Sequence, residues 1–230
     1  MTLIIAAEGK DLVILGADSR ATIESGRTRV EINFMEKIIP VSKHVAVLLA
    51  GEAEVADRLV ERFKLSLRKK DDGVSNIADK LTQFCIKDAL RLAGVPMHPE
   101  YFPDFGFIIA GLDKRREQYK IPRTYTLDSL TGFRLGLSRR FAIDGKRMIA
   151  YYLFAKEFEQ GMNRDDVCAL VAKALNDTLS IDGDVGGKIR MAQIDSIGFD
   201  PIPETEIQND YIVPWDVEKL RSIAEKKEKK

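Results

Sequence analysis

The sequence predicts an α+β fold of four layers, αββα, in which two stacked antiparallel sheets are flanked by helices. Strand-like and helix-like segments come in blocks, in the order strands, two helices, strands, two helices, strands. Short turns join consecutive strands, and strands joined in this way form antiparallel pairs. Strands that cluster apart from helices are typical of α+β rather than βαβ proteins. Two helix pairs in one chain of 230 residues fit two sheets that each carry helices on the outside.

Short apolar segments rich in Val, Ile and Leu predict the strands that precede the first helix. The first two strands flank a polar turn around Gly9, which is typical of a hairpin. The last two flank a turn at residues 41–43, and their composition suits a buried pair. A mixed, edge-like strand lies between the two pairs. The expected strands are residues 2–7, 11–16, 27–34, 37–40 and 44–49.

Apolar residues then recur at helical spacing, with charged residues on the opposite face. A first helix follows Gly51, and a second begins with Ser75 as its N-cap and ends at Gly94 and Pro96. Asn163 caps the last helix of the second pair, and acidic residues fill that helix's first turn, where the helix dipole favours them. The apolar stripes of the four helices cover residues 55–67, 77–92, 147–158 and 167–179.

Strands are expected again between the two helix pairs and after the last helix. The pair Asp128-Ser129 is a turn signal inside this region, and Gly186-Gly187 precedes the final strand pair. These strands are residues 105–111, 119–125, 127–133, 140–143, 188–194 and 196–202. Residues 1–203 are predicted to form one domain, and residues 204–230 a polar C-terminal extension.

Composition excludes several classes of protein. Lys plus Arg and Asp plus Glu both number 36, and a balanced chain argues against non-specific nucleic-acid binding. The longest apolar runs are too short to span a bilayer, and the N-terminus has no signal-peptide pattern. These features predict a cytoplasmic protein with neither a nucleic-acid nor a membrane partner. Cys85 and Cys168 fit reduced core thiols, because they have no CxxC spacing.

The sequence offers few residues for metal, nucleotide or histidine-based catalysis. There is no GxxxxGK[ST], GxGxxG or HExxH motif, and the only histidines are His44 and His98. We therefore expect no metal and no organic cofactor, and a catalytic base other than histidine. Thr2 follows Met1, and loss of Met1 would expose a hydroxyl nucleophile beside its own α-amine. Such an amine has a pKa of about 7.7–8.0 and can act as a base.

Four motifs occur in order along the chain: Thr2, then Asp18-Ser19-Arg20-Ala21-Thr22, then Lys37-Ile38, then Ala50-Gly51. With these motifs the sequence resembles the β-type subunits of the 20S proteasome, a family of N-terminal nucleophile hydrolases. The resemblance covers roughly residues 2 to 200. It implies the αββα sandwich of that family, which the order of elements already predicts.

The resemblance implies a role for each motif. Thr2 would attack the scissile carbonyl through its Oγ, and its α-amine would take the proton. Lys37 would lie beside Thr2 and lower the pKa of that amine, because a nearby cation disfavours its protonation. Asp18 would pair with Lys37 and orient it. The backbone N–H of Gly51 would donate to the oxyanion.

Two positions depart from the family pattern. Ile143-Asp144-Gly145 stands where the family has Gly-Ser-Gly, and Val185 stands where it has Ser before the paired glycines. The resemblance would place Asp144 and Asp182 at the site together with Asp18. An added carboxylate raises the pKa of the amine and makes it a poorer base at neutral pH. We therefore expect weak activity or an alkaline optimum.

By resemblance, the substrate pocket would be lined by Ala21, Ile39, Leu49 and Ala53, whose apolar character favours cleavage after apolar side chains. The sequence thus predicts a threonine-type endopeptidase subunit that hydrolyses polypeptides in a homo-oligomeric ring or with an α-type partner. Two alternatives stay open. One is a non-catalytic structural ring subunit that retains Met1. The other is a small-molecule amidase or ligase of the wider superfamily, working as a free monomer or dimer.

Overall fold

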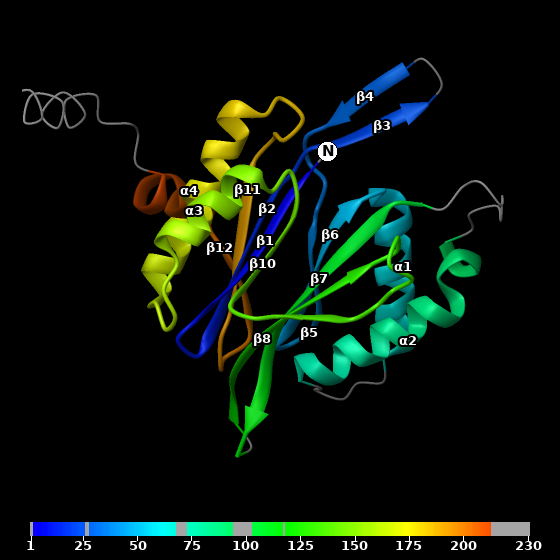
Figure 1. The fold of residues 1–230 in the computed structure, drawn as a ribbon, viewed down its shortest axis with the longest axis horizontal. Coiled ribbons are helices and arrows are strands. Elements are labelled where there is room, and N and C mark those ends of the chain that lie inside the picture. The colour runs from blue at the N-terminus through cyan, green and yellow to red at the C-terminus, as the bar shows by residue number, and fades with distance from the viewer. Residues whose placement is uncertain (1, 26–27, 68–72, 94–102, 117, 213–230) are drawn as a thin grey trace, which may run out of the picture.

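Two antiparallel five-stranded sheets form the centre of the molecule (Figure 1). The computed structural model describes residues 2–25, 28–67, 73–93, 103–116 and 118–212. The N-terminal sheet has the strand order β10 (Phe141–Gly145), β1 (Leu3–Gly9), β2 (Leu12–Asp18), β11 (Ile189–Ile194) and β12 (Phe199–Ile202). The second sheet has the order β5 (Ile38–Ser42), β6 (Val45–Gly51), β7 (Phe105–Arg115), β8 (Gln118–Asp128) and β9 (Gly136–Ser138).

Helices cover the outer face of each sheet, so the predicted four-layer αββα sandwich is confirmed. Helices α1 (Ala53–Ser66) and α2 (Val74–Ala93) lie on the second sheet, and α3 (Met148–Glu157) and α4 (Arg164–Ile181) lie on the N-terminal sheet. After β12 the chain forms a short helix α5 (Glu204–Glu206) and a π-helical turn η1 (Ile207–Tyr211), and Ile207 is buried against α4. No helix of the described residues has the length and apolarity needed to cross a membrane.

Strands buried on both faces explain why the first segments are continuously apolar. Side chains alternate along a strand, so Leu3 and Ile5 pack under α3 and α4, whereas Ile4 and Ala6 enter the layer between the sheets. The layer between the sheets consists of small and branched apolar side chains from both sheets. Cys85 and Cys168 are free and buried in the two helical layers, as predicted.

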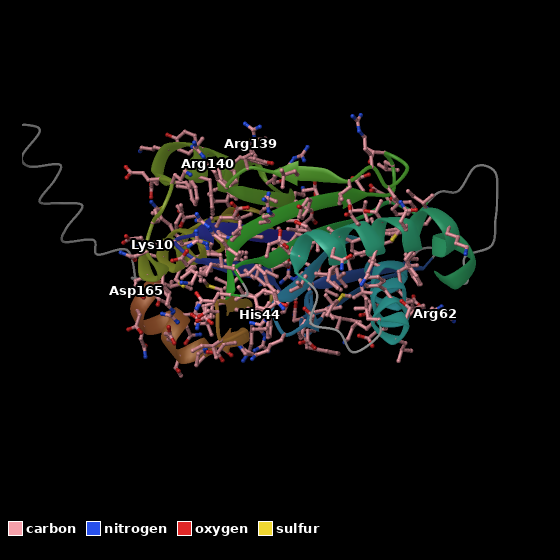
Figure 2. The ribbon with its side chains drawn as sticks, turned by 90° about the horizontal axis from the view of Figure 1, so that it is seen from below. Lys10, His44, Arg62, Arg139, Arg140 and Asp165 are labelled. Carbon is pink, nitrogen blue, oxygen red and sulfur yellow. The ribbon has the colours of Figure 1, made fainter. Side chains whose placement is uncertain are left out.

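Turns tie the two sheets together at one end of the sandwich. The His44 ring, just before β6, stacks on Tyr119 with 3.7 Å between ring centroids, and its Nε2 lies 3.3 Å from the carbonyl oxygen of Ser196. The β1–β2 turn is instead bound to the helical layer of its own sheet, because the N–H of Lys10 donates to the carbonyl of Met162 at 2.9 Å, beside the start of α4 (Figure 2). The opposite strand ends carry the site described below.

Two local predictions need correction. Residues 21–25 form a strand, β3, which pairs only with β4 (Thr28–Ile32) in a separate hairpin that projects beyond the sheets (Figure 1). The two strands expected over 119–125 and 127–133 are one strand, β8, which ends at Asp128. The strand expected over 27–34 is β4, and only β3 was missed, because its five residues form a short strand outside the core.

Of the two helix N-caps predicted from the sequence, one is correct and one is wrong. Asn163 caps α4 as predicted, because its Oδ1 accepts the N–H of Asp166 at 2.9 Å. Ser75 is not the N-cap of α2, which begins one residue earlier. Instead, the side chain of Asp113 in β7 accepts the N–H of Ser75 at 3.0 Å. A residue from a distant strand thus accepts one of the backbone N–H groups that have no partner within the first turn of the helix. Gly94 and Pro96, expected to end this helix, lie outside the described residues.

Gly16 allows α4 to approach β2 closely, which gives a test of the packing. A Cβ at this position would lie 2.5 Å from Cγ1 of Val171 and 2.8 Å from Cδ1 of Leu175. Replacing Gly16 with alanine should therefore overpack this layer and lower the free energy of unfolding by about 1–3 kcal/mol. Denaturant unfolding measures the change. Gly183→Ala is the matched control, since nothing lies within 4 Å of a Cβ there; equal midpoints for the two variants would contradict the prediction.

Candidate active site

Four of the predicted site residues come together where strands of the two sheets end. Thr2 precedes β1, Asp18 ends β2, Lys37 precedes β5, and Gly51 ends β6. The N-terminus in Figure 1 lies at this end, close to the base of the β3–β4 hairpin. A small pocket of about 50 Å³ opens here. It is lined by Thr2, Arg20, Ala21, Thr22, Lys37, Leu49, Ala50 and Gly51.

Thr2, Asp18 and Lys37 form a buried hydrogen-bonded cluster. The hydroxyl of Thr2 donates to Oδ1 of Asp18 at 2.8 Å, and Nζ of Lys37 donates to the same oxygen at 2.6 Å. Nζ of Lys37 also donates to Oγ1 of Thr2. The exposed fractions are 8% for Thr2, 0% for Asp18 and 3% for Lys37. A hydroxyl, a carboxylate and an ammonium therefore share one site that is largely shielded from water.

Asp18 organises more than this cluster. Its Oδ1 also accepts the N–H of Leu3 at 2.9 Å, and its Oδ2 accepts the N–H groups of Arg20 and Gly186, both at 3.2 Å. Backbone donors from three segments thus satisfy a carboxylate that burial would otherwise destabilise. Both oxygens of the Asp18 side chain therefore have hydrogen-bond donors, and Lys37 adds an opposite charge.

Burial lowers the pKa of Lys37 below its ordinary value of 10.5, because desolvation disfavours the ammonium form. The charge of Asp18 and its hydrogen bond oppose this shift, and the charge of Arg20 adds to it. Lys37 can therefore place a positive charge, or a proton donor, directly against Oγ1 of Thr2. This arrangement stabilises negative charge that develops on that oxygen.

Gly51 supplies a backbone N–H at the pocket. The N–H of Leu49 donates to the carbonyl of Lys37 at 3.0 Å, and N–H directions alternate along a strand. The N–H of Gly51 therefore points to the same edge of β6, one step beyond the start of β5, where the pocket lies. Gly51 has φ of +85°, and a Cβ would overlap the carbonyl oxygen of Asp104, so only glycine fits. An N–H at this place is suited to bind an oxyanion.

The pocket walls agree only partly with the residues expected to line them. Ala21 and Leu49 line the pocket, but Ile39 does not. Ile39 pairs with Val47, whereas Ile38 pairs with Leu48 nearer the pocket. The Ile39 side chain packs in the layer under α1 and α2. The side chain of Ala53 lies outside the described residues.

Two polar residues, Arg20 and Thr22, also line the pocket, and neither was predicted to do so. Oγ1 of Thr22 is buried and has no hydrogen-bond partner among the described residues, so it is available to a bound ligand. Arg20 braces the pocket, donating from Nη1 to the carbonyl of Gly183 at 2.7 Å and from Nε to Oδ1 of Asn33 at 3.0 Å. Both residues belong to the Asp-x-Arg-Ala-Thr motif, and the motif was the signal that could have found them.

The contacts of Asp144 do not bring it to Thr2, Asp18 or Lys37. It lies opposite Ile4 in the β1–β10 pair, and its Oδ1 accepts the N–H of Gly145 at 2.7 Å, with Oδ2 beside Gly106 of the second sheet. Burial raises the pKa of the Asp144 carboxyl. Gly145 is the residue that packs against Thr2: its φ is +86°, and a Cβ would overlap the carbonyl of Thr2. The register of β10 therefore sends the Asp144 carboxylate away from the cluster.

Asp182 and Val185 lie in the loop between α4 and β11. Oδ2 of Asp182 is 3.4 Å from Nζ of Lys146, whose backbone N–H donates to the carbonyl of Thr2 at 2.8 Å. Asp182 is thus connected to Thr2 through Lys146, a residue that was not among the predicted site residues. Val185 is 2% exposed and packs in the layer with α4, so it offers no hydroxyl to the site. No metal-binding group of His, Cys, Asp or Glu occurs among the described residues.

Comparisons with known proteins agree with this geometry. A family model described as "Proteasome subunit" matches residues 2–194. A proteasome β subunit of Streptomyces griseus is 26% identical over 193 residues, 81% of this chain and 63% of that protein. The match therefore spans less than two thirds of the Streptomyces subunit. Proteasome subunit β type-1 of Saccharomyces cerevisiae is 24% identical over 207 residues, 86% of each chain, and a β subunit of Picrophilus torridus is 22% identical, over 90% and 91%.

The buried pair predicts a pH-dependent loss of stability in Asp18→Asn. The variant leaves the Lys37 ammonium without its carboxylate, which should lower the free energy of unfolding by about 3–5 kcal/mol at pH 7. It should also lower the pKa of folded Lys37 further, whereas unfolded Lys37 keeps its ordinary value of 10.5. Between these two pKa values Lys37 is protonated in the unfolded chain and neutral in the folded one. The free energy of unfolding of the variant therefore increases as the pH rises through this range.

Denaturant unfolding of both proteins at pH 7 and pH 10 measures this difference. The gap between wild type and Asp18→Asn should shrink at the higher pH. Asp200→Asn, an exposed carboxylate on β12, is the control and should differ little from wild type at either pH. A gap of the same size at both pH values would show that Lys37 does not titrate as the geometry requires.

Proposed function

The chain belongs to the proteasome subunit family as a β-type subunit, and we propose that it is a threonine-type peptidase with Thr2 as its nucleophile. The observation that carries this proposal is the contact of the Thr2 hydroxyl with both the Asp18 carboxylate and the Lys37 ammonium at a pocket. Removal of Met1 would complete the site by freeing the α-amine of Thr2.

The reaction follows from these groups. The α-amine takes the proton of the Thr2 hydroxyl as Oγ1 attacks the peptide carbonyl, and the N–H of Gly51 binds the resulting oxyanion. The C–N bond then breaks, the leaving amine takes the proton, and the acyl group stays on Oγ1 as an ester. Water hydrolyses the ester by the same route. Lys37, held by Asp18, lowers the pKa of the α-amine and stabilises the charge on Oγ1.

The pocket favours a polypeptide substrate with an apolar residue before the cleaved bond. Its walls include the aliphatic side chains of Ala21 and Leu49, and its volume of about 50 Å³ suits a small side chain. The free Oγ1 of Thr22 is placed to bind the peptide backbone. We propose that the subunit acts in the cytoplasm, within a ring of its own copies or beside an α-type partner, without a metal or organic cofactor.

One observation favours a second candidate, a structural ring subunit without activity. Val185 is buried in the apolar layer with α4, where the family resemblance expects a serine near the nucleophile's amine. If Met1 stays in place, no free threonine amine exists and the structural role is the correct one. An amidase or ligase of the wider superfamily would instead run as a monomer or dimer in size-exclusion chromatography.

The intact mass of the purified protein should show complete loss of Met1. A peptide epoxyketone with an apolar side chain at the reactive end should then add to Thr2, increasing the mass by one inhibitor. Thr2→Ala should abolish both the adduct and peptide cleavage. Lys37→Met, which keeps the length of the side chain, should lower kcat by about 10²–10⁴-fold.

Thr82→Ala is the matched control, because Thr82 is a buried threonine on α2, away from the pocket. It should keep the adduct and the rate of the parent. Retention of Met1 in all molecules, or an adduct that survives Thr2→Ala, would overturn the assignment of Thr2 as nucleophile.

A further inference from the structure

Lys146 closes a ring of contacts around Thr2. Its backbone N–H donates to the Thr2 carbonyl at 2.8 Å, and its Nζ lies 3.4 Å from a carboxylate oxygen of Asp182 and 3.4 Å from one of Asp184. The loop that carries these two carboxylates continues to Gly186, whose N–H donates to Asp18. Asp18 in turn accepts the Thr2 hydroxyl. Thr2 is thus held from its carbonyl side and its hydroxyl side by one connected set of residues.

Other contacts hold the carboxylates of these ion pairs in place. Asp182 is the C-cap of α4, and its Oδ1 accepts the N–H of Asp184 at 3.0 Å, so the two carboxylates are fixed relative to each other. The three side chains are only 27–32% exposed. The hydrogen bond to Asp182, and the charges of both carboxylates, raise the pKa of the Lys146 ammonium, which therefore stays protonated at neutral pH.

We propose that Lys146 is a positioning residue for Thr2, and that its pairing with Asp182 and Asp184 sets the charge that the α-amine of Thr2 experiences. This inference rests on the proposed function, because it needs a free Thr2 amine as the base. It assigns a role to a lysine at the segment where the chain departs from the Gly-Ser-Gly pattern. The charged side chains on the segments that contact Thr2 are Asp18 from β2, Lys37 before β5, Arg20 from the β2–β3 link, and Lys146, Asp182 and Asp184. Asp144 of β10 lies toward the second sheet instead.

The net charge of Lys146, Asp182 and Asp184 determines the direction in which the pKa of the Thr2 amine should shift. With Lys146 in place, its group of three side chains carries one net negative charge. Without the ammonium it carries two, which favours the protonated amine and raises its pKa. Without the Asp184 carboxylate the group is neutral, which lowers the pKa of the amine. A role in folding alone would not move the pKa in opposite directions.

The test is the pH dependence of kcat/KM in three variants. The acid limb, which reports the free α-amine, should move up by about 0.3–0.8 pH unit in Lys146→Met at low salt and down by a similar amount in Asp184→Asn. Lys146→Arg should restore the parent profile. The backbone N–H of residue 146 is present in every variant, so only the side chain is tested. Both shifts should shrink in 0.5 M NaCl, because salt screens partly exposed charges.

Lys188→Met is the matched control. Nζ of Lys188 pairs with Glu204 at 2.9 Å on the surface, outside the ring of contacts around Thr2, and its loss should leave the acid limb unchanged. The proposal is wrong if Lys146→Met and Asp184→Asn leave the limb in place or move it in the same direction. A parent protein that forms no Thr2-dependent epoxyketone adduct would instead refute the proposed function, and the pH profiles separate these two failures.

Discussion

The carboxylate of Asp18 is fully buried and accepts hydrogen bonds from five donors, and the arrangement of the site depends on it. An isolated buried carboxylate is costly, so a fold that places one at the end of β2 must bring donors to it. The donors come from the start of β1, the turn after β2, the residue before β5 and the loop before β11. Because those donors converge on one side chain, four segments that are distant in sequence end at the same place.

The same convergence brings the Thr2 hydroxyl and the Lys37 ammonium together. Thr2 and Lys37 share Oδ1 of Asp18, so their separation is set by the geometry of one oxygen atom rather than by two independent loops. A buried ion pair of this kind adds little net stability, since desolvation offsets its attraction. Its contribution is to hold an ammonium of lowered pKa against a hydroxyl oxygen. The stability comes from the three apolar layers on either side of and between the sheets.

The sequence could predict what local pattern and strand position determine. Motifs that resemble those of the family predict Thr2, Asp18, Lys37 and Gly51 as site residues, and the structure brings these four together. The α4 cap at Asn163 is correctly predicted because capping is local. The lining role of Ile39, the strand β3 and the cap of α2 depend on which residue faces which across tertiary contacts. No local pattern encodes those pairings.

A one-residue register explains the largest error at the site. Sequence analysis placed Asp144 beside the amine, but pairing of Leu3 with Gly145 puts residue 146 opposite Thr2 and turns Asp144 toward the second sheet. A shift of one residue exchanges the two faces of a strand, and composition cannot reveal it. The residue that does meet Thr2, Lys146, uses its backbone N–H, a group that every residue but proline supplies.

The two sides of Thr2 therefore depend on different kinds of contact. On the hydroxyl side, a specific carboxylate and a specific ammonium are required, and the chain keeps the family motif there. On the carbonyl side, the contact that holds Thr2 is a backbone hydrogen bond, so the neighbouring side chains can change without releasing it. Lys146, which makes this contact, lies two residues after Asp144, where the chain departs from the family pattern. The fold therefore fixes the position of Thr2 through Asp18 and leaves the side chains on its carbonyl side open to variation.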